Sequence, residues 1–415
     1  MHAPGHSPRA TPTLATLTDD KSDHTQDPLP PGAPRVNERN DLVSPTRCRT
    51  ARMSHMHAQR WCFVALWMCF GSSAFASPGP LPGTEDIPKL MAASALVCKG
   101  QVVEAPAPTF VPTSAGMTRL TAIAKVRPDR CFKGTPNDTL ISVLFDGFVS
   151  GVDSSFVLRE GDYRLFFLKP QNGKYAVVDV RFGALSVSRK LGSAPESSDG
   201  MYLLEFDLKA GLRDSSPERV LDSIRMLGNM KHIRSTSELT QLLDGSDLLV
   251  KTYVWQALLR LKDYSELPAV SEFFNSQPEP APELILPRDR LLQMQYELAN
   301  EIGAIRDPST LRFIERFAVT GKGYSLRMNA LQSLRAMGSP HSEAAFLKEL
   351  DDSNSDNAFS AMQGLLSLAG GGPIGWVPTW KQFDQAPQFY AAKCREWWQT
   401  EGQKKAAYRA TEPPF

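Results

Sequence analysis

Three stretches of the sequence can be laid over one another: Leu298-Ala-Asn-Glu-Ile-Gly-Ala-Ile305, Ala330-Leu-Gln-Ser-Leu-Arg-Ala-Met337 and Ala361-Met-Gln-Gly-Leu-Leu-Ser-Leu368. Each places apolar residues at i, i+4 and i+7, which is one face of an α-helix. Their central residues Ile302, Leu334 and Leu365 stand 32 and 31 residues apart. A near-constant period of this length predicts a stacked helical array, in which each unit buries its apolar face against its neighbours.

A fourth stretch, Ala257–Tyr264, fits the same pattern, but its central residue Leu261 lies 41 residues before Ile302. Most of the excess is Gln277-Pro-Glu-Pro-Ala-Pro-Glu283, a stiff proline-rich insertion that predicts a loop on one face of the array. Because the array departs from its own spacing there, we expect a partner to bind at this insertion. The candidate partner-binding residues are Glu279, Glu283 and Leu284.

Turn residues separate paired helical stretches in this half of the chain, at Asp307-Pro308 and Gly338-Ser-Pro340. The pairs are Ala257–Leu261 with Leu267–Phe273, Ala299–Pro308 with Leu311–Phe317, and Ala330–Gly338 with Glu343–Leu350. This arrangement resembles HEAT repeats, a family of paired antiparallel helices that stack into a curved rod. The resemblance implies an all-α solenoid over residues 236–415 that binds a protein partner through its concave face or its ridges.

The end of the chain does not repeat. After Gly370-Gly-Gly-Pro373 it becomes rich in aromatic residues, namely Trp376, Trp380, Phe383, Phe389, Tyr390, Trp397 and Trp398. The last unit of a solenoid must be covered, so we expect a capping helix with buried aromatic side chains. The alternative is an exposed aromatic platform for a ligand.

Residues 77–212 have the short alternating stretches of a β domain. The predicted strands are Leu96–Val103, Thr118–Val126, Thr139–Phe145, Gly161–Leu168, Tyr175–Asp179 and an edge strand at Met201–Phe206. Asn172-Gly173 predicts a tight hairpin turn, because both residues tolerate positive φ. Residues 213–235 are expected to be a linker with a helix at Arg219–Asn229. The predicted fold class is therefore multidomain α+β, with a small all-β barrel followed by an all-α solenoid.

The β domain also carries a resemblance, through Leu96-Val-Cys-Lys-Gly100, Arg130-Cys-Phe-Lys-Gly134, Glu160–Leu168 and Gly183-Ala-Leu-Ser186. These stretches resemble the OB-type barrel of netrin-like and tissue-inhibitor-of-metalloproteinase-like domains. The resemblance implies an OB-like barrel over residues 88–190 and a binding role. In the animal inhibitors a cysteine at the mature N-terminus chelates the protease zinc, but Cys98 lies well inside this chain, so that mechanism does not carry over.

The N-terminal part resembles an export signal. A basic region from Met53 precedes the apolar core Trp61–Phe70, and Ala74-Phe-Ala76 is a small-x-small cleavage site, so residues 53–76 predict a signal peptide. The alternative, a membrane anchor, needs about 20 apolar residues. We expect cleavage, no stable membrane insertion afterwards, and a periplasmic or extracellular location. Residues 1–52 are polar and proline-rich, which predicts disorder, or a reading frame extended upstream of a start at Met53 or Met56.

An exported chain meets an oxidising compartment, so Cys98 and Cys131 of the β domain are expected to form a disulfide; two buried free thiols are the alternative. Cys394, among aromatic residues, is expected to be a buried free thiol.

No catalytic, metal-binding or cofactor-binding constellation stands out in the sequence. His232 and His341 are too isolated for a zinc site, and no nucleophile elbow or phosphate-binding loop occurs. Asp352, Asn354 and Asp356 are spaced as in a calcium loop that lacks its glycine and its final glutamate, so helix capping is expected. With 46 Lys and Arg against 45 Asp and Glu, the charge balance argues against nucleic-acid binding.

These observations predict a non-enzymatic exported protein, without a cofactor, that binds a protein partner or serves as a scaffold through its helical-repeat surface. The alternative is an inhibitor or regulator of an extracytoplasmic hydrolase, which acts through the barrel rim at Asp146–Ser155.

Overall fold

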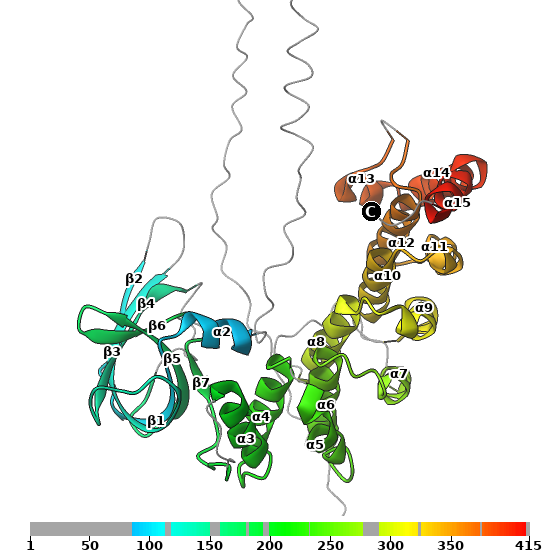
Figure 1. Cartoon of the computed structure of the whole chain (residues 1–415). Coiled ribbons are helices and arrows are strands. Elements are labelled where there is room, and N and C mark those ends of the chain that lie inside the picture. The colour runs from blue at the N-terminus through cyan, green and yellow to red at the C-terminus, as the bar shows by residue number, and fades with distance from the viewer. Residues whose placement is uncertain are drawn as a thin grey trace, which may run out of the picture. The chain divides into compact units, whose positions relative to one another are not determined.

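The structure is a computed structural model that describes residues 85–112, 118–149, 158–179, 182–193, 199–231, 233–276, 290–322, 325–373 and 376–411. The expected disordered segment 1–52 and signal peptide 53–76 lie outside the described residues. All described residues belong to one of two units of the chain, Pro78–Phe415. Within it a small β-barrel is followed by a helical region, as predicted (Figure 1).

The β half forms one sheet that closes on itself. Its strands are β1 (Leu96–Glu104), β2 (Thr109–Pro112), β3 (Thr118–Lys133), β4 (Ile141–Val149), β5 (Tyr163–Gln171), β6 (Lys174–Val177) and β7 (Ala184–Ser186). Five of them make a ring in the order β1-β3-β4-β6-β5, because β1 pairs with both β3 and β5. The β4–β6 pair is parallel and the other pairs are antiparallel. β5 and β6 join at Asn172-Gly173, whose φ angles of 50° and 73° confirm the predicted hairpin turn.

Strands β1 and β5 are buried on both faces. Leu96 and Cys98 of β1 point into the barrel core with Phe166 of β5. The alternate residues Val97 and Leu165 join a second core shared with the helices that follow. Cys98 and Cys131 face each other in the β1–β3 ladder and form a disulfide. Because successive side chains of a strand point to opposite faces, one pair of strands supplies both cores.

The helical region has its first helix where the sequence suggested an edge strand. Met201–Phe206 lies within α3 (Gly200–Gly211), so the strand prediction is wrong. Asp199 caps this helix by accepting hydrogen bonds from the backbone N–H groups of Met201 and Tyr202. The buried residues Leu204 and Leu208, four apart, then continue a helical face.

Helix α3 is tied to the barrel through the buried carboxylate of Asp207. Arg130 Nη1 and the backbone N–H of Gly192 donate to its Oδ1 at 2.9 and 2.8 Å, and Lys99 Nζ lies 3.4 Å from its Oδ2. Lys99, 1% exposed, also donates to the carbonyl of Lys190 at 2.8 Å. Burial lowers the pKa of Lys99, against the opposing charge of Asp207. Strands β1 and β3, the segment after β7 and helix α3 therefore meet at one carboxylate.

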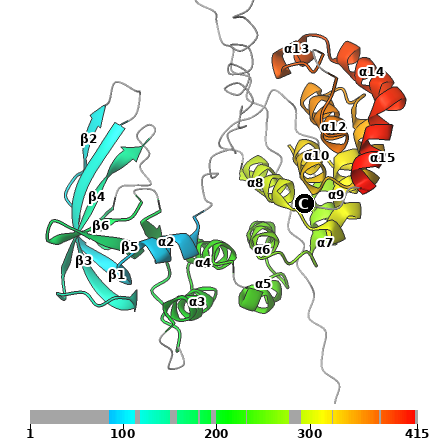
Figure 2. The same cartoon turned by 45° about the horizontal axis from the view of Figure 1, so that its top comes forward.

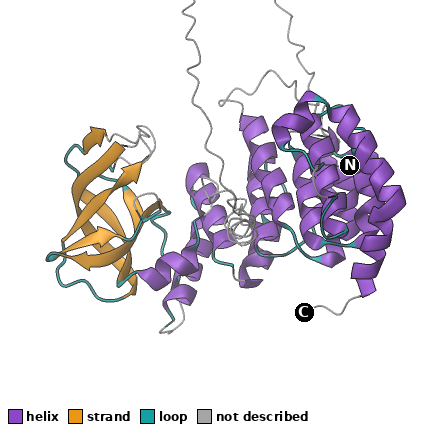
Figure 3. Ribbon diagram, turned by 90° about the horizontal axis from the view of Figure 1, so that it is seen from above, coloured by secondary structure: helices purple, strands orange, loops and turns teal. Residues whose placement is uncertain are grey.

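The remaining helices form two rows and a cap (Figure 1). An inner row consists of α4 (Pro217–Asn229), α6 (Leu248–Arg260), α8 (Arg290–Ala304), α10 (Leu326–Met337) and α12 (Ser355–Leu368). An outer row consists of α7 (Leu267–Ser276), α9 (Leu311–Thr320) and α11 (Glu343–Glu349). The others are α2 (Ile87–Ala93) before β1, α5 (Thr236–Gln241), and the cap helices α13 (Trp380–Gln385), α14 (Pro387–Trp397) and α15 (Gln403–Thr411). Strands and helices occupy separate parts of this unit (Figure 3).

Three of the overlaid stretches lie at the ends of α8, α10 and α12, whereas only Ala257–Arg260 of the fourth stretch belongs to α6. Ile302, Leu334, Leu365 and Leu261 are all buried in the packed cores between helices. Helix α4, expected as part of a linker, packs directly on α6: a Cβ on Gly228 would lie 2.7 Å from the Cα of Ala257. Helices of the inner row thus contact one another from α4 to α12.

The cap buries some of its aromatic residues and exposes others. Helices α13 and α14 pack against α12 (Figure 2). Phe383, Trp397 and Trp398 are buried, whereas Trp380 is 40% and Phe389 59% exposed. Cys394 is a buried free thiol, as predicted, and burial raises its pKa to about 12.

A second group of buried charges lies between α10 and α11. Arg327 Nη2 contacts the carboxylates of both Glu349 and Asp352. Burial raises the pKa of Glu349 to about 7, against the opposing effect of Arg327, and the neighbouring Asp352 adds to the rise. Near Asp352, Asn354 caps α12 by accepting from the backbone N–H groups of Asp356 and Asn357, as expected for the Asp352–Asp356 stretch.

We predict that Asp207→Asn lowers the free energy of unfolding by about 3 kcal/mol, because it leaves the buried ammonium of Lys99 without a counter-charge. Chemical denaturation measures the change, with Asp244→Asn, at an exposed position, as the control. An unchanged denaturation midpoint for Asp207→Asn would show that this carboxylate does not hold α3 to the barrel.

We predict that stability falls by about 2 kcal/mol as pH rises from about 4.5 to about 7 and then levels off. The folded pKa of Glu349 exceeds its ordinary value, so the folded state holds this proton more tightly and loses the advantage as the proton leaves. Glu349→Gln should flatten the fall, whereas Glu396→Gln, at an exposed position, should not. Denaturation over this pH range measures both; equal pH dependence in the two variants would contradict the assignment.

Candidate functional site

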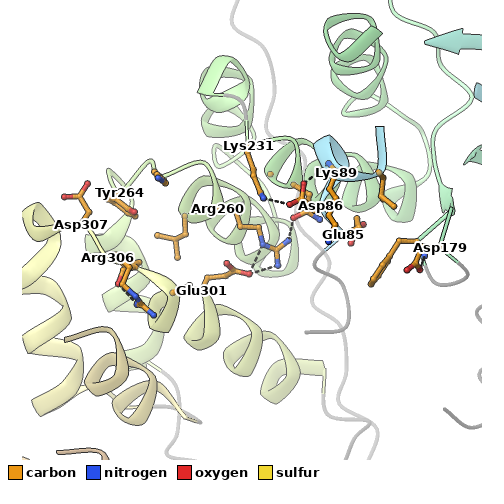
Figure 4. Close-up of a pocket in the computed structure, with 18 of the residues that line it drawn as sticks. Glu85, Asp86, Lys89, Asp179, Lys231, Arg260, Tyr264, Glu301, Arg306 and Asp307 are labelled. Carbon is orange, nitrogen blue, oxygen red and sulfur yellow. Dashed lines mark hydrogen bonds and ion pairs between the residues drawn. The ribbon is translucent and has the colours of Figure 1, made fainter. Parts of the chain in front are cut away.

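A groove of about 980 Å³ lies between the barrel side of the unit and the helical rows (Figure 4). One wall, here called the barrel wall, consists of residues 85–93, which include α2, and of the segment between β6 and β7. The other, the helical wall, consists of the C-terminal ends of α4, α6 and α8 with the residues that follow them. The groove is therefore lined by both halves of the molecule.

Three inner helices end at this groove because they are equivalent units of one row. Helices α4 and α6 are each followed, two residues after their last helical residue, by a lysine in the left-handed region, Lys231 with φ 57° and Lys262 with φ 62°. These lysines are 31 residues apart, the spacing of the later repeats. A left-handed residue after a helix turns the chain away from the helix axis, and both lysines line the groove.

A line of hydrogen bonds crosses the helical wall. Arg260 donates from Nε to Glu301 Oε1 at 2.7 Å and from Nη1 to Asn229 Oδ1 at 3.0 Å. It thereby joins the ends of α4, α6 and α8, as Figure 4 shows for Arg260 and Glu301. Both charged side chains are mostly buried. The wall is held in shape by its own side chains.

An ion pair joins the two walls. Lys231 Nζ lies 2.5 Å from Asp86 Oδ2, and the Asp86 side chain also caps α2 by accepting from the backbone N–H of Lys89. Burial alone would raise the pKa of Asp86, but Lys231 and the cap outweigh it and hold the pKa below its ordinary value. Beside it, buried Glu85 pairs with Arg225 of α4 at 3.1 Å.

At the α8 end of the groove, side chains are bonded to the local backbone. Arg306 Nη1 donates to the carbonyls of Gly303 and Ile305 at 2.6 and 2.7 Å. The Asp307 carboxylate accepts from the backbone N–H of Ser309, which lowers the pKa of Asp307, and Lys262 lowers it further. Burial raises the pKa of the nearby Tyr264.

The residues named from the sequence lie elsewhere. Cys98 and Cys131 are in the barrel, and Glu279, Glu283 and Leu284 lie outside the described residues, as does His232. His341 is exposed on the helical array. In the part of the chain that the structure describes, no group of three His, Cys, Asp or Glu side chains could hold a metal ion. None of the described helices has the length and apolar character needed to cross a membrane.

Sequence reasoning missed the groove. Its charged residues come from segments as far apart as Asp86 and Asp307, and no motif links them. The equal spacing of Lys231 and Lys262 is a signal that the repeat comparison could have used. No family model and no curated protein matches this chain, so the site rests on its geometry.

We predict that Arg260→Met costs about 2 kcal/mol of unfolding free energy, because Glu301 loses its partner in a mostly buried place. The double variant Arg260→Met/Glu301→Met should recover part of the loss. Chemical denaturation measures both, with Arg316→Met on the exposed side of α9 as the control. Strictly additive effects of the two substitutions would mean that the pair is not coupled.

Proposed function

We propose that this protein is a non-enzymatic binding protein that holds a polypeptide segment of a partner protein in the groove between the barrel wall and the helical wall. The observation that carries the proposal is a groove of about 980 Å³ to which two different parts of the fold contribute. Pockets for small molecules are mostly apolar and enclosed. This groove differs, because ten of the side chains that line it are charged. So many charged groups fit a polypeptide partner better than a small molecule.

The distribution of polar and apolar side chains also supports a protein partner. Leu90, Leu259 and Ile305 are buried residues of the lining, whereas Lys89 and Lys262 are exposed. An apolar centre with a charged rim is typical of protein–protein interfaces. The ion pairs Arg260–Glu301 and Lys231–Asp86 hold the walls in place before a partner arrives, which lowers the entropy cost of binding.

We also propose that the protein acts outside the cytoplasm. The Cys98–Cys131 disulfide supports this, since such bonds persist in oxidising compartments. The paired helices support a HEAT-like solenoid, and the closed five-stranded ring supports an OB-like, netrin-type barrel. Inhibition of a hydrolase through the rim at residues 146–155 is the other function considered from the sequence. Part of that rim lies outside the described residues, and no described contact favours it.

We predict that peptides selected from a random library displayed on phage against the full chain bind in this groove. Ala304 is exposed at the end of α8 and lines the groove, so Ala304→Trp should fill the space and weaken binding at least tenfold, a loss of about 1.4 kcal/mol. Ala336 is the equivalent exposed residue of α10, 32 positions on, and does not line the groove.

Ala336→Trp is therefore the matched control and should leave binding unchanged. Titration calorimetry with the selected peptides measures both variants, and circular dichroism checks their folding. If no peptide is enriched, or if both variants bind as the parent chain does, the groove is not the binding site.

A further inference from the structure

Each carboxylate of the groove has an ion-pair or hydrogen-bond partner, although neither oxygen of Glu85 accepts a hydrogen bond from a described residue. Glu301 pairs with Arg260, Asp86 with Lys231, and Glu85 with Arg225. The two that remain accept backbone hydrogen bonds: Asp179 from the N–H of Phe182 at 3.0 Å, and Asp307 from the N–H of Ser309 at 2.9 Å. A cationic ligand would have to compete with Arg260, Lys231 or a backbone N–H for most carboxylates in the lining.

Two cations have no direct partner in the described part of the chain, although the charge of Lys89 acts on Asp86 and that of Lys262 on Asp307. Among the described residues, neither Lys89 nor Lys262 has an ion pair or a hydrogen bond from its Nζ. Both side chains are exposed, and both line the groove. They lie on opposite walls, Lys89 on α2 of the barrel wall and Lys262 just after α6 on the helical wall. Lys231, although paired with Asp86, is still 60% exposed and lies beside the end of α4.

We propose that the groove selects an acidic segment of the partner protein, with Asp or Glu side chains placed between Lys89 and Lys262. This inference rests on the proposed function and adds the charge of the segment. Each lysine has three donors and a flexible stem, so the pair can adapt to carboxylates at different positions along an extended peptide. Charges of this kind speed association and set the choice of partner more than they add affinity.

Repulsion between like charges strengthens the selection. A basic segment would meet Lys89 and Lys262 as exposed like charges on both walls of the groove. Like charges brought together at an interface disfavour wrong partners. The groove is thus balanced in total charge, and its two exposed cations without an ion pair to a described residue favour an anionic segment.

The test uses the same phage selection on the full chain, followed by calorimetry with the enriched peptides. We expect enrichment of Asp and Glu, and binding that weakens as salt is raised, because exposed charges are screened. Lys89→Gln and Lys262→Gln should each weaken binding about threefold to tenfold, and Lys89→Glu/Lys262→Glu should select basic peptides instead. Lys262→Arg should retain affinity, and Lys381→Glu, on the exposed face of α13, should change nothing.

The outcomes separate this inference from the function on which it rests. Suppose that the peptides bind less well to Ala304→Trp, but are not enriched in Asp and Glu and bind both lysine variants as tightly as the parent chain. This result would overturn the charge selection but would leave the groove as a binding site. Peptides that bind without any response to Ala304→Trp would overturn both. The same acidic peptide is then tested with an amidated and with a free C-terminus. We expect equal affinity, because side-chain carboxylates and not the terminal carboxylate are bound.

Discussion

The carboxylate of Asp207 is the contact on which the arrangement of this unit depends. It forms ion pairs with both Lys99 and Arg130 where strands β1 and β3 meet helix α3. Lys99 and Asp207 are buried, and removing charges from water is costly, so loss of either partner would leave an uncompensated buried charge. Helix α3 then packs on α4, and α4 on α6. The position of the barrel wall relative to the helical wall follows from this chain of contacts.

The helical half was predictable because its signal is periodic and local. Ile302, Leu334 and Leu365 occupy equivalent buried positions, as an apolar face repeated at constant spacing requires. Alternating apolar residues located β1, β3, β4, β5 and β6, but they missed the short strand β2 and ended β3 at Val126 instead of Lys133. The strand prediction was wrong at Met201–Phe206. There the helix is favoured by the cap from Asp199 and by the burial of Leu204 and Leu208 on one helical face. A short apolar run cannot be assigned by periodicity alone.

The groove could not be predicted in the same way, because it belongs to no single segment. Its walls combine residues before β1, after β6 and at the ends of three helices, and only the closed barrel and the stacked row bring them together. The proline-rich insertion was predicted to be a binding site because it interrupts the regular spacing of the helices. Lys89 and Lys262 do not interrupt any sequence pattern. Their proposed role in binding depends on which neighbouring charges already have partners, and the sequence alone does not show that.

Helices α10 and α12 end with glycines in the left-handed region, Gly338 and Gly370, as helices commonly do. The ends of α4 and α6 instead hold Lys231 and Lys262 in that strained conformation. Glycine at these two positions would relax the backbone and would be the choice of any redesign aimed at thermal tolerance alone. It would also delete the cations from the groove. The two helix ends that line the groove therefore keep a less favourable backbone conformation together with an exposed positive charge. If the proposed binding is right, these turns exchange some stability for affinity.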